Sequence, residues 1–207
     1  MEGFTARTAW LSATGLWWLL LLVWVVMRFG IKPTKRREGW GQYARHVLAV
    51  AVGFWLLFGS GTNGGWFDQR WLPDVPTAWG AGLLLTAAGV AASIWARGTL
   101  GKNWSSAVTL KADHQLIRHG LYRRIRHPIY SGILLGMIGT AMILGRLRGL
   151  VGCVVVFGAF YVKARREEQF LRQEFGKEFE EHTRRTGMFL PKWTEGARTG
   201  AGTASRG

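Results

Sequence analysis

The chain has a single cysteine and few acidic residues, and each shortage excludes a class of protein. Cys153 stands alone among 207 residues, so neither a disulfide within the chain nor a site built from several thiolates is available. The five histidines show no pair at the ligand spacing of a recognisable metal motif, so we expect no bound metal. Only 12 Asp and Glu residues balance 27 Lys and Arg residues, which leaves a net charge of +15. So basic a chain suits either nucleic acid or an anionic membrane surface.

Charged residues are absent from five apolar runs, at 8–27, 47–67, 75–96, 128–145 and 149–162. The first four are each roughly long enough to cross a hydrocarbon core of about 30 Å as a helix. The fifth is shorter, but Arg148 and Lys163 at its ends can extend to the membrane surface. We therefore predict an all-α integral membrane protein with about five transmembrane helices. Because the basic residues flank these helices and form no single soluble patch, we expect no nucleic acid partner.

The chain also lacks a nucleotide-binding loop in the required context. Residues 59–64 read GSGTNG, which fits the pattern G-x-G-x-x-G. That pattern binds dinucleotides where it follows a short parallel strand and opens a helix, whereas this segment follows a predicted transmembrane helix. We interpret residues 59–65 as a flexible loop and predict no Rossmann-type cofactor site.

A cluster of polar groups begins the fourth apolar run, where residues 123–135 read RRIRHPIYSGILL. Pro128 suits the first turn of a helix, which places His127 at or near the cap. The free N–H groups and the positive end of the helix dipole then lie beside three arginines, which together form an anion site. Ordinary positive-inside anchoring accounts for the arginines. It does not account for His127 and Tyr130, which put hydrogen-bonding groups into the first turn.

A second polar cluster follows the fifth run, where residues 163–182 read KARREEQFLRQEFGKEFEEH. Leu171, Phe175 and Phe179 recur every four residues, which predicts an amphipathic cytoplasmic helix on the bilayer surface. Glu167 and Glu168 lie about one turn beyond the membrane exit. Neighbouring residues on a helix point about 100° apart, so we expect only one of the two carboxylates to face a site formed with the start of the fourth run. The other should face water or lipid head groups.

The two clusters together resemble the isoprenylcysteine carboxyl methyltransferase family, which is related to the phospholipid methyltransferases. The resemblance rests on HQLIRHGLYRRIRHPIYSG at 114–132, on EEQFLRQEFGKEF at 167–179, and on the later Pro191. The patterns G-x-Y-x-x-x-R-H-P-x-Y-x-G and E-E-x-x-L-x-x-x-F-G are specific as a pair. We place the motif-bearing part at 107–193, within one membrane-embedded domain at 1–193, and predict a disordered tail at 194–207.

The resemblance implies a membrane enzyme that uses S-adenosyl-L-methionine without a Rossmann domain. Its acceptor would be a lipid-like or prenylated molecule at the cytoplasmic membrane face, and carboxyl O-methylation of an isoprenylcysteine-type substrate is the reaction we expect first. A phospholipid amine N-methyltransferase is the alternative within the same class. Two hypotheses come from different classes. One is an NADPH-dependent sterol-type reductase, which carries a similar HP-x-Y-x-G segment, and the second is a non-enzymatic scaffold that binds membrane lipids.

The resemblance also assigns roles to individual residues. By position, the cofactor contacts fall on His114, Gln115, Leu116, Ile117, Tyr122, His127, Pro128, Ile129, Tyr130 and Glu167. The candidate catalytic residues are Glu167, His127 and Lys163, and the resemblance selects Glu167 over Glu168. Lys163 takes the place of an arginine that the eukaryotic members use towards the substrate carboxylate. A lysine supplies a point charge without the bidentate fork, so Arg165 or Arg166 is an alternative for that role.

The distribution of positive charge predicts the topology. Arg7, Arg70, Arg146 and Arg148 lie on one side of the predicted spans, and the other 23 Lys and Arg residues lie on the opposite side. Because connections rich in Lys and Arg stay in the cytoplasm, we expect an outside N-terminus, a cytoplasmic C-terminus and a site that faces the cytoplasm. An alkaline phosphatase fused to the C-terminus should be inactive in bacterial cells, whereas a fused green fluorescent protein should fluoresce. An active phosphatase fusion would contradict the topology.

Overall fold

A computed structural model of the chain describes residues 4–28, 34–37, 39–59, 65–101, 109–111 and 116–192. Three of the sequence predictions lie outside these residues. They are the disordered tail at 194–207, most of the GSGTNG loop, and the cofactor contacts at His114 and Gln115.

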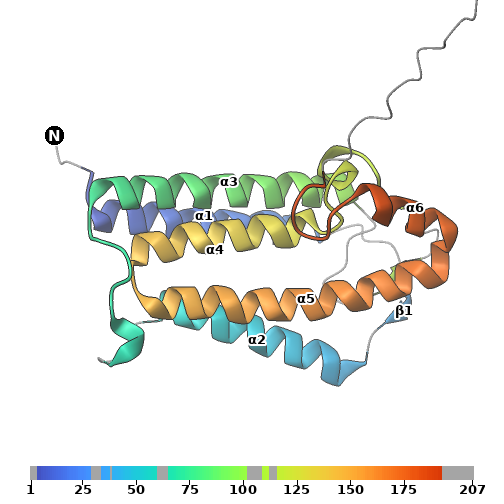
Figure 1. Cartoon of the computed structure of the whole chain (residues 1–207), viewed down its shortest axis with the longest axis horizontal. Coiled ribbons are helices and arrows are strands. Elements are labelled where there is room, and N and C mark those ends of the chain that lie inside the picture. Colours follow the sequence, from blue (N-terminus) through green and yellow to red (C-terminus); the bar gives the residue numbers. More distant parts are fainter. Residues whose placement is uncertain are drawn as a thin grey trace, which may run out of the picture.

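Helices dominate the described part of the chain, as predicted. They are α1 (Ala6–Val26), α2 (Trp40–Phe58), α3 (Pro76–Leu100), α4 (Pro128–Leu144), α5 (Leu147–Phe175) and α6 (Lys177–Arg185), with the 3-10 turns η1 (Trp66–Asp68) and η3 (Gly120–Arg123). α1, α3 and α4 pack side by side, and α5 with α2 lies against them through α4 (Figure 1). The predicted all-α class needs one small correction. The strands β1 (Thr34–Arg37) and β2 (Thr109–Lys111) pair antiparallel.

Three of the helices, α1, α3 and α5, are long and apolar enough to cross a membrane, and α4 is a shorter apolar helix. These four cover four of the five predicted spans. The bounds of α2 differ from the predicted run at 47–67. It begins at Trp40, directly after Gly39, and ends where Gly59 takes an extended conformation. Hydropathy alone misplaced this helix because its first turns carry polar residues and its last predicted residues are glycine-rich.

The predicted amphipathic helix at 163–182 is not a separate element. α5 continues through Val162 without interruption because no glycine or proline occurs between that residue and Phe175. The break comes at Gly176, whose φ of 47° lies in the left-handed region that glycine tolerates. α6 then starts in a new direction. Phe179 is only 1% exposed, so this part of the apolar stripe packs against the protein.

The interface of α3 and α4 is built from small residues. A Cβ atom on Gly82 would lie 2.5 Å from the carbonyl oxygen of Gly139, and one on Gly132 would lie 2.6 Å from the carbonyl oxygen of Gly89. Such distances are shorter than any normal contact, so the two backbones can approach only because these side chains are absent. Close approach through small residues is the usual way in which helices associate in lipid, where apolar burial gives little net gain.

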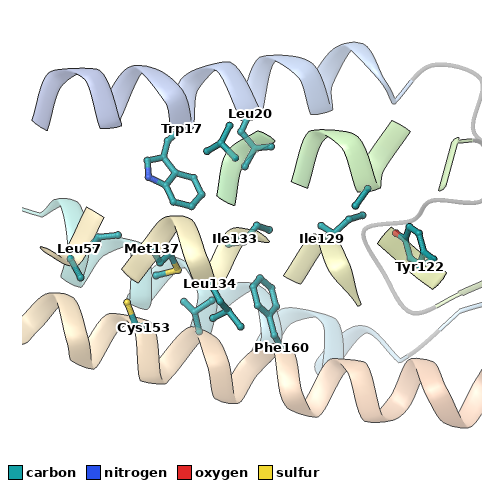
Figure 2. Packing of buried hydrophobic residues seen from close by; sticks show 14 residues of the cluster. Trp17, Leu20, Leu57, Tyr122, Ile129, Ile133, Leu134, Met137, Cys153 and Phe160 are labelled. Carbon is teal, nitrogen blue, oxygen red and sulfur yellow. The ribbon is translucent and has the colours of Figure 1, made fainter. Parts of the chain in front are cut away.

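Buried polar groups at this interface satisfy one another. The Nε1–H of Trp17 in α1 donates to Thr140 Oγ1 at 3.0 Å, and Thr140 Oγ1 lies 3.2 Å from Thr86 Oγ1. Thr86 also donates to the carbonyl oxygen of Gly82 at 2.9 Å. The apolar core surrounds this network, and Figure 2 shows Trp17 of α1 above α4 and Cys153 of α5 below it. α4 is therefore held from both sides, and its N-terminal end has a defined position.

The glycine interface predicts a difference between two neighbouring positions of α3. Gly82→Ala places a methyl group against the α4 backbone and should lower the free energy of unfolding by about 1–3 kcal/mol, the usual effect of overpacking. Gly80→Ala is the matched control because a Cβ atom there meets no atom within 4 Å. Thermal unfolding of both variants in detergent measures the difference. Equal stability of Gly82→Ala and Gly80→Ala would contradict the close approach.

Candidate active site

The site begins at the N-terminus of α4. Pro128 occupies the first turn and His127 is the N-cap residue, as predicted. The His127 side chain makes no capping hydrogen bond to its own helix. Its imidazole is therefore free to interact with another element, and it reaches α5.

Two successive carboxylates of α5 hold the His127 ring. His127 Nδ1 lies 3.3 Å from Glu167 Oε2, and His127 Nε2 lies 3.4 Å from Glu168 Oε1. The prediction that Glu168 faces water or head groups is wrong, because its side chain is only 1% exposed. Glu167 and Glu168 do leave the helix about 100° apart, as predicted. The imidazole, however, lies across α5 and has a nitrogen on each side of its ring. Two long side chains that leave the helix about 100° apart can therefore converge on it. We call this arrangement the His127 clamp.

Glu168 is bound by more than His127. Arg126 Nε donates to Glu168 Oε1 at 2.7 Å, and a guanidinium nitrogen of Arg172 lies 3.4 Å from Oε2. Arg126 lies just before α4, whereas Arg172 lies on α5 one turn after Glu168. The Glu168 carboxylate therefore ties the two elements together. A buried carboxylate is tolerable only when charge and hydrogen bonds compensate its desolvation, as they do here.

Glu167 has a different environment and is 23% exposed. The hydroxyl of Tyr130 donates to Glu167 Oε1 at 2.6 Å, and Lys163 Nζ lies 4.0 Å from the same oxygen. The Lys163 ammonium also lies 5.5 Å from the centroid of the Tyr130 ring. The structure thus brings together all of the predicted catalytic residues, with Tyr130 between them.

The clamp favours the protonated form of His127. Burial alone would lower the pKa of His127, but its contacts with Glu167 and Glu168 and the negative charges of both groups outweigh that effect and raise the pKa. A protonated imidazole carries a proton on both nitrogens, which suits a ring placed between two carboxylates, although the 3.4 Å contact of Nε2 with Glu168 is an ion pair without hydrogen-bond geometry.

A row of aromatic rings forms one wall of the site. Tyr130 stacks on Phe160 of α5 with centroids 4.5 Å apart, and His127 stacks on Tyr130 with centroids 5.4 Å apart. Phe189 tilts against His127 at 6.0 Å. Phe160 and Phe189 were not among the residues predicted from the sequence. Both are aromatics within segments that carry no motif, and only the late Pro191 drew attention to that part of the chain.

The segment that carries Phe189 crosses the start of α4. The His127 N–H donates to the Met188 carbonyl at 3.1 Å, and the Arg126 N–H donates to the Gly187 carbonyl at 2.9 Å. Ser131 Oγ donates to the Phe189 carbonyl at 2.6 Å. Residues 187–190 therefore satisfy backbone and side-chain donors next to the clamp and fix the position of His127.

The remaining predicted residues surround this centre at different depths. Tyr122 in η3 is buried, and burial together with the charge of Glu167 raises its pKa. Leu116 and Ile117 are half-buried, and Ile117 packs against the core cluster that includes Ile129. Pro128 is fully buried, Arg165 is exposed and Arg166 is half-buried. Within the described ranges, no group of three or more His, Cys, Asp or Glu side chains is placed to hold a metal ion.

The segment that builds this site matches a known family. Residues 78–178, which run from α3 into α6 and include the whole clamp, match the family model described as phospholipid methyltransferase. Curated relatives that the chain resembles carry the name of a more specific class of methyltransferase. A probable protein-S-isoprenylcysteine O-methyltransferase of Oryza sativa subsp. indica is 38% identical over 96 residues, which are 45% of this chain and 50% of the relative. The predicted resemblance to the isoprenylcysteine carboxyl methyltransferase family is thereby confirmed.

Two further likenesses extend beyond the motif-bearing part. The protein-S-isoprenylcysteine O-methyltransferase of Dictyostelium discoideum is 26% identical over 196 residues, which are 92% of this chain and 78% of the relative. A solved structure of the eukaryotic intramembrane Ras methyltransferase ICMT gives a TM-score of 0.47 at 23% identity, over 74% of this chain and 53% of that one. The chain spans about half the length of the first curated relatives that it matches.

The clamp predicts that Glu168 matters for stability. Glu168→Gln removes the charge that pairs with Arg126 and His127 and should lower the free energy of unfolding by about 3 kcal/mol, as when a buried ion pair loses one partner. The same substitution should also weaken the dependence of the free energy of unfolding on pH. His127 contributes stability below its ordinary pKa of 6.5, and that contribution is lost as the pH rises through the raised pKa of the folded protein. Unfolding of the wild type, Glu168→Gln and the exposed control Glu181→Gln across this pH range tests both effects. A Glu168→Gln variant as stable as the control would contradict the clamp.

Proposed function

We propose that the chain is an S-adenosylmethionine-dependent membrane methyltransferase that esterifies the carboxylate of an isoprenylcysteine-type acceptor at the cytoplasmic membrane face. One observation carries the proposal. His127, Tyr130, Lys163 and Glu167 converge where the start of α4 meets α5, within the segment that matches the family. The names of the curated relatives support the same reaction. We infer a single membrane-embedded domain with this site on its cytoplasmic side.

The residues of the site fit S-adenosylmethionine. Glu167 is a partly exposed carboxylate, and a carboxylate retains acceptor capacity after one hydrogen bond from Tyr130. The ring of Tyr130 stacks on Phe160 and on His127, so Tyr130 would meet the cofactor through its hydroxyl, which can still accept a hydrogen bond. The aromatic ring of Tyr122 suits an adenine ring or a cation. Glu167, His127, Tyr130 and Tyr122 would therefore hold the cofactor, and Leu116 and Ile117 would complete the contact.

Lys163 is the group that would meet the acceptor. When bound, S-adenosylmethionine supplies an electrophilic methyl group, which becomes bonded to a carboxylate oxygen of the acceptor as its bond to sulfur breaks, and S-adenosylhomocysteine is left. A carboxylate is ionised at neutral pH, so the reaction needs no base. The Lys163 ammonium is buried, and its charge acts more strongly on a carboxylate there than it would in water. The lysine can thus orient the acceptor without proton transfer.

Phospholipid amine N-methylation is the second candidate because the matching family model carries that description. An ammonium must lose a proton before it can attack, so this reaction needs a base. His127 lies between two carboxylates that raise its pKa and favour its protonated form, which makes it a poor base. Glu167 would be the remaining base, and it already interacts with three donors. The site therefore favours the carboxylate acceptor.

A labelling experiment separates these functions. The purified protein should transfer a labelled methyl group from S-adenosylmethionine to N-acetyl-S-farnesylcysteine, and the product should release labelled methanol in alkali, as an ester does. Glu167→Gln should lower turnover by roughly 100-fold, about 3 kcal/mol of lost interaction in a partly desolvated site. Glu181→Gln, an exposed change on α6, should keep full activity. Alkali-stable label in phospholipid would favour the amine reaction, and stabilisation by NADPH in place of S-adenosylhomocysteine would contradict a methyltransferase.

A further inference from the structure

His46 of α2 lies beside the site and has no role in the proposed function. Its ring centroid is 5.8 Å from that of Phe160, which stacks on Tyr130, which in turn stacks on His127. Four rings thus form a continuous row from α2 to the start of α4. His46 occupies the end of the row opposite to the His127 clamp.

One nitrogen of His46 is a buried acceptor without a partner. His46 makes a hydrogen bond to the backbone of Ala159 in α5, whereas its Nδ1 has no hydrogen-bond partner among the described residues. A backbone carbonyl can only accept, so the nitrogen that faces Ala159 carries the proton, and Nδ1 of the neutral ring has a free lone pair. Buried polar atoms are paired in the large majority of cases, and an unpaired one lowers stability. The cost is removed when a ligand supplies a donor.

His46 lies on the Lys163 side of the site. Ala159 and Lys163 are four residues apart on α5 and therefore share one face of the helix. The charge of Lys163 is the largest electrostatic influence on His46, and Glu167 also acts on it. The Lys163 ammonium itself is directed at Glu167 and Tyr130. A ligand whose anionic group binds Lys163 would thus bring its neighbouring atoms close to His46.

The half of α2 that carries His46 has no fully buried residue. The two buried residues of α2, Gly53 and Leu57, both lie in its second half. Around His46 the neighbouring residues Arg45 and Val47 are exposed. α2 also diverges from α5 towards its N-terminal end (Figure 1). Because Nδ1 is buried, this half of α2 must shift slightly for a ligand to reach it.

We propose that His46 is a positioning residue for the methyl acceptor, an inference that rests on the proposed carboxyl methylation. Nδ1 accepts a hydrogen bond from the amide N–H of the prenylated cysteine whose carboxylate binds Lys163. The N–H and the carboxylate are attached to the same Cα atom, so one acceptor presents a donor and an anion at a short, fixed separation. His46 on α2 and Lys163 on α5 offer an acceptor and a cation to these two groups. The site then prefers an N-acylated cysteine to a prenylated acid that lacks the N–H.

Two probes test this preference. N-acetyl-S-farnesylcysteine carries the amide N–H, and S-farnesyl-3-thiopropionate has the same thioether and carboxylate without it. Wild-type protein should show a KM for the thiopropionate about five- to tenfold higher, the effect of one hydrogen bond, with kcat changed less. His46→Leu should raise the KM for the cysteine probe until the two probes are nearly equal. His46→Asn, whose amide oxygen can occupy the position of Nδ1, should retain most of the preference, and so should the exposed control Arg45→Gln.

A binding measurement accompanies the kinetics. Thermal stabilisation of the cofactor-free protein by each probe should show the same order, and the affinity of His46→Leu for S-adenosylhomocysteine should equal that of the wild type. A wild type that does not distinguish the two probes overturns the role of His46 without any variant. Equal preference in the wild type and in His46→Leu also overturns it, while the proposed function stands. Failure of the wild type to methylate either probe overturns the proposed function and this inference together.

Discussion

The contact of His127 with Glu167 and Glu168 determines how the rest of the site is arranged. It joins the first residue before α4 to the C-terminal third of α5, and these two elements also carry Tyr130 and Lys163. A cation between two carboxylates in a buried position is favourable only when all three groups are held in place. Arg126 and Arg172 hold Glu168, whereas Tyr130 and Lys163 hold Glu167. The two carboxylates therefore differ in role. Glu168 fixes the imidazole, and we propose that the more exposed Glu167 meets the ligand.

The glycine interface between α3 and α4 fixes the position of His127 relative to the two carboxylates. α4 is held against α3 by backbone approach and against α5 by the core around Met137, so its N-terminal end has little freedom. Residues 187–190 then cover that end and bind the N–H groups of Arg126 and His127. The packing of small residues within the apolar helices thus positions the polar residues at their ends. A methyl transfer that depends on alignment more than on acid–base chemistry requires this kind of rigidity.

Much of the site could be predicted because its residues lie in two short patterns. Pro128 indicates a helix start, and the paired motifs bring His127, Tyr130 and Glu167 together. Glu168 was misplaced because a helical wheel gives the direction of a side chain but neither its reach nor the shape of its partner. Phe160 and His46 could not be found, because an aromatic in an apolar run and a lone histidine before one have no local signal. The length of α5 depends on where a glycine first breaks the helix, and hydropathy does not report that.

We propose that a methyl donor binds where the start of α4 meets α5. A structure determined with S-adenosylhomocysteine tests it most directly. We expect the ligand to contact Glu167 and Tyr130, with its sulfur on the side of Lys163, while the contacts of Glu168 with Arg126 and His127 stay unchanged. A ligand bound elsewhere, or one that displaces Glu168 from His127, would contradict the account.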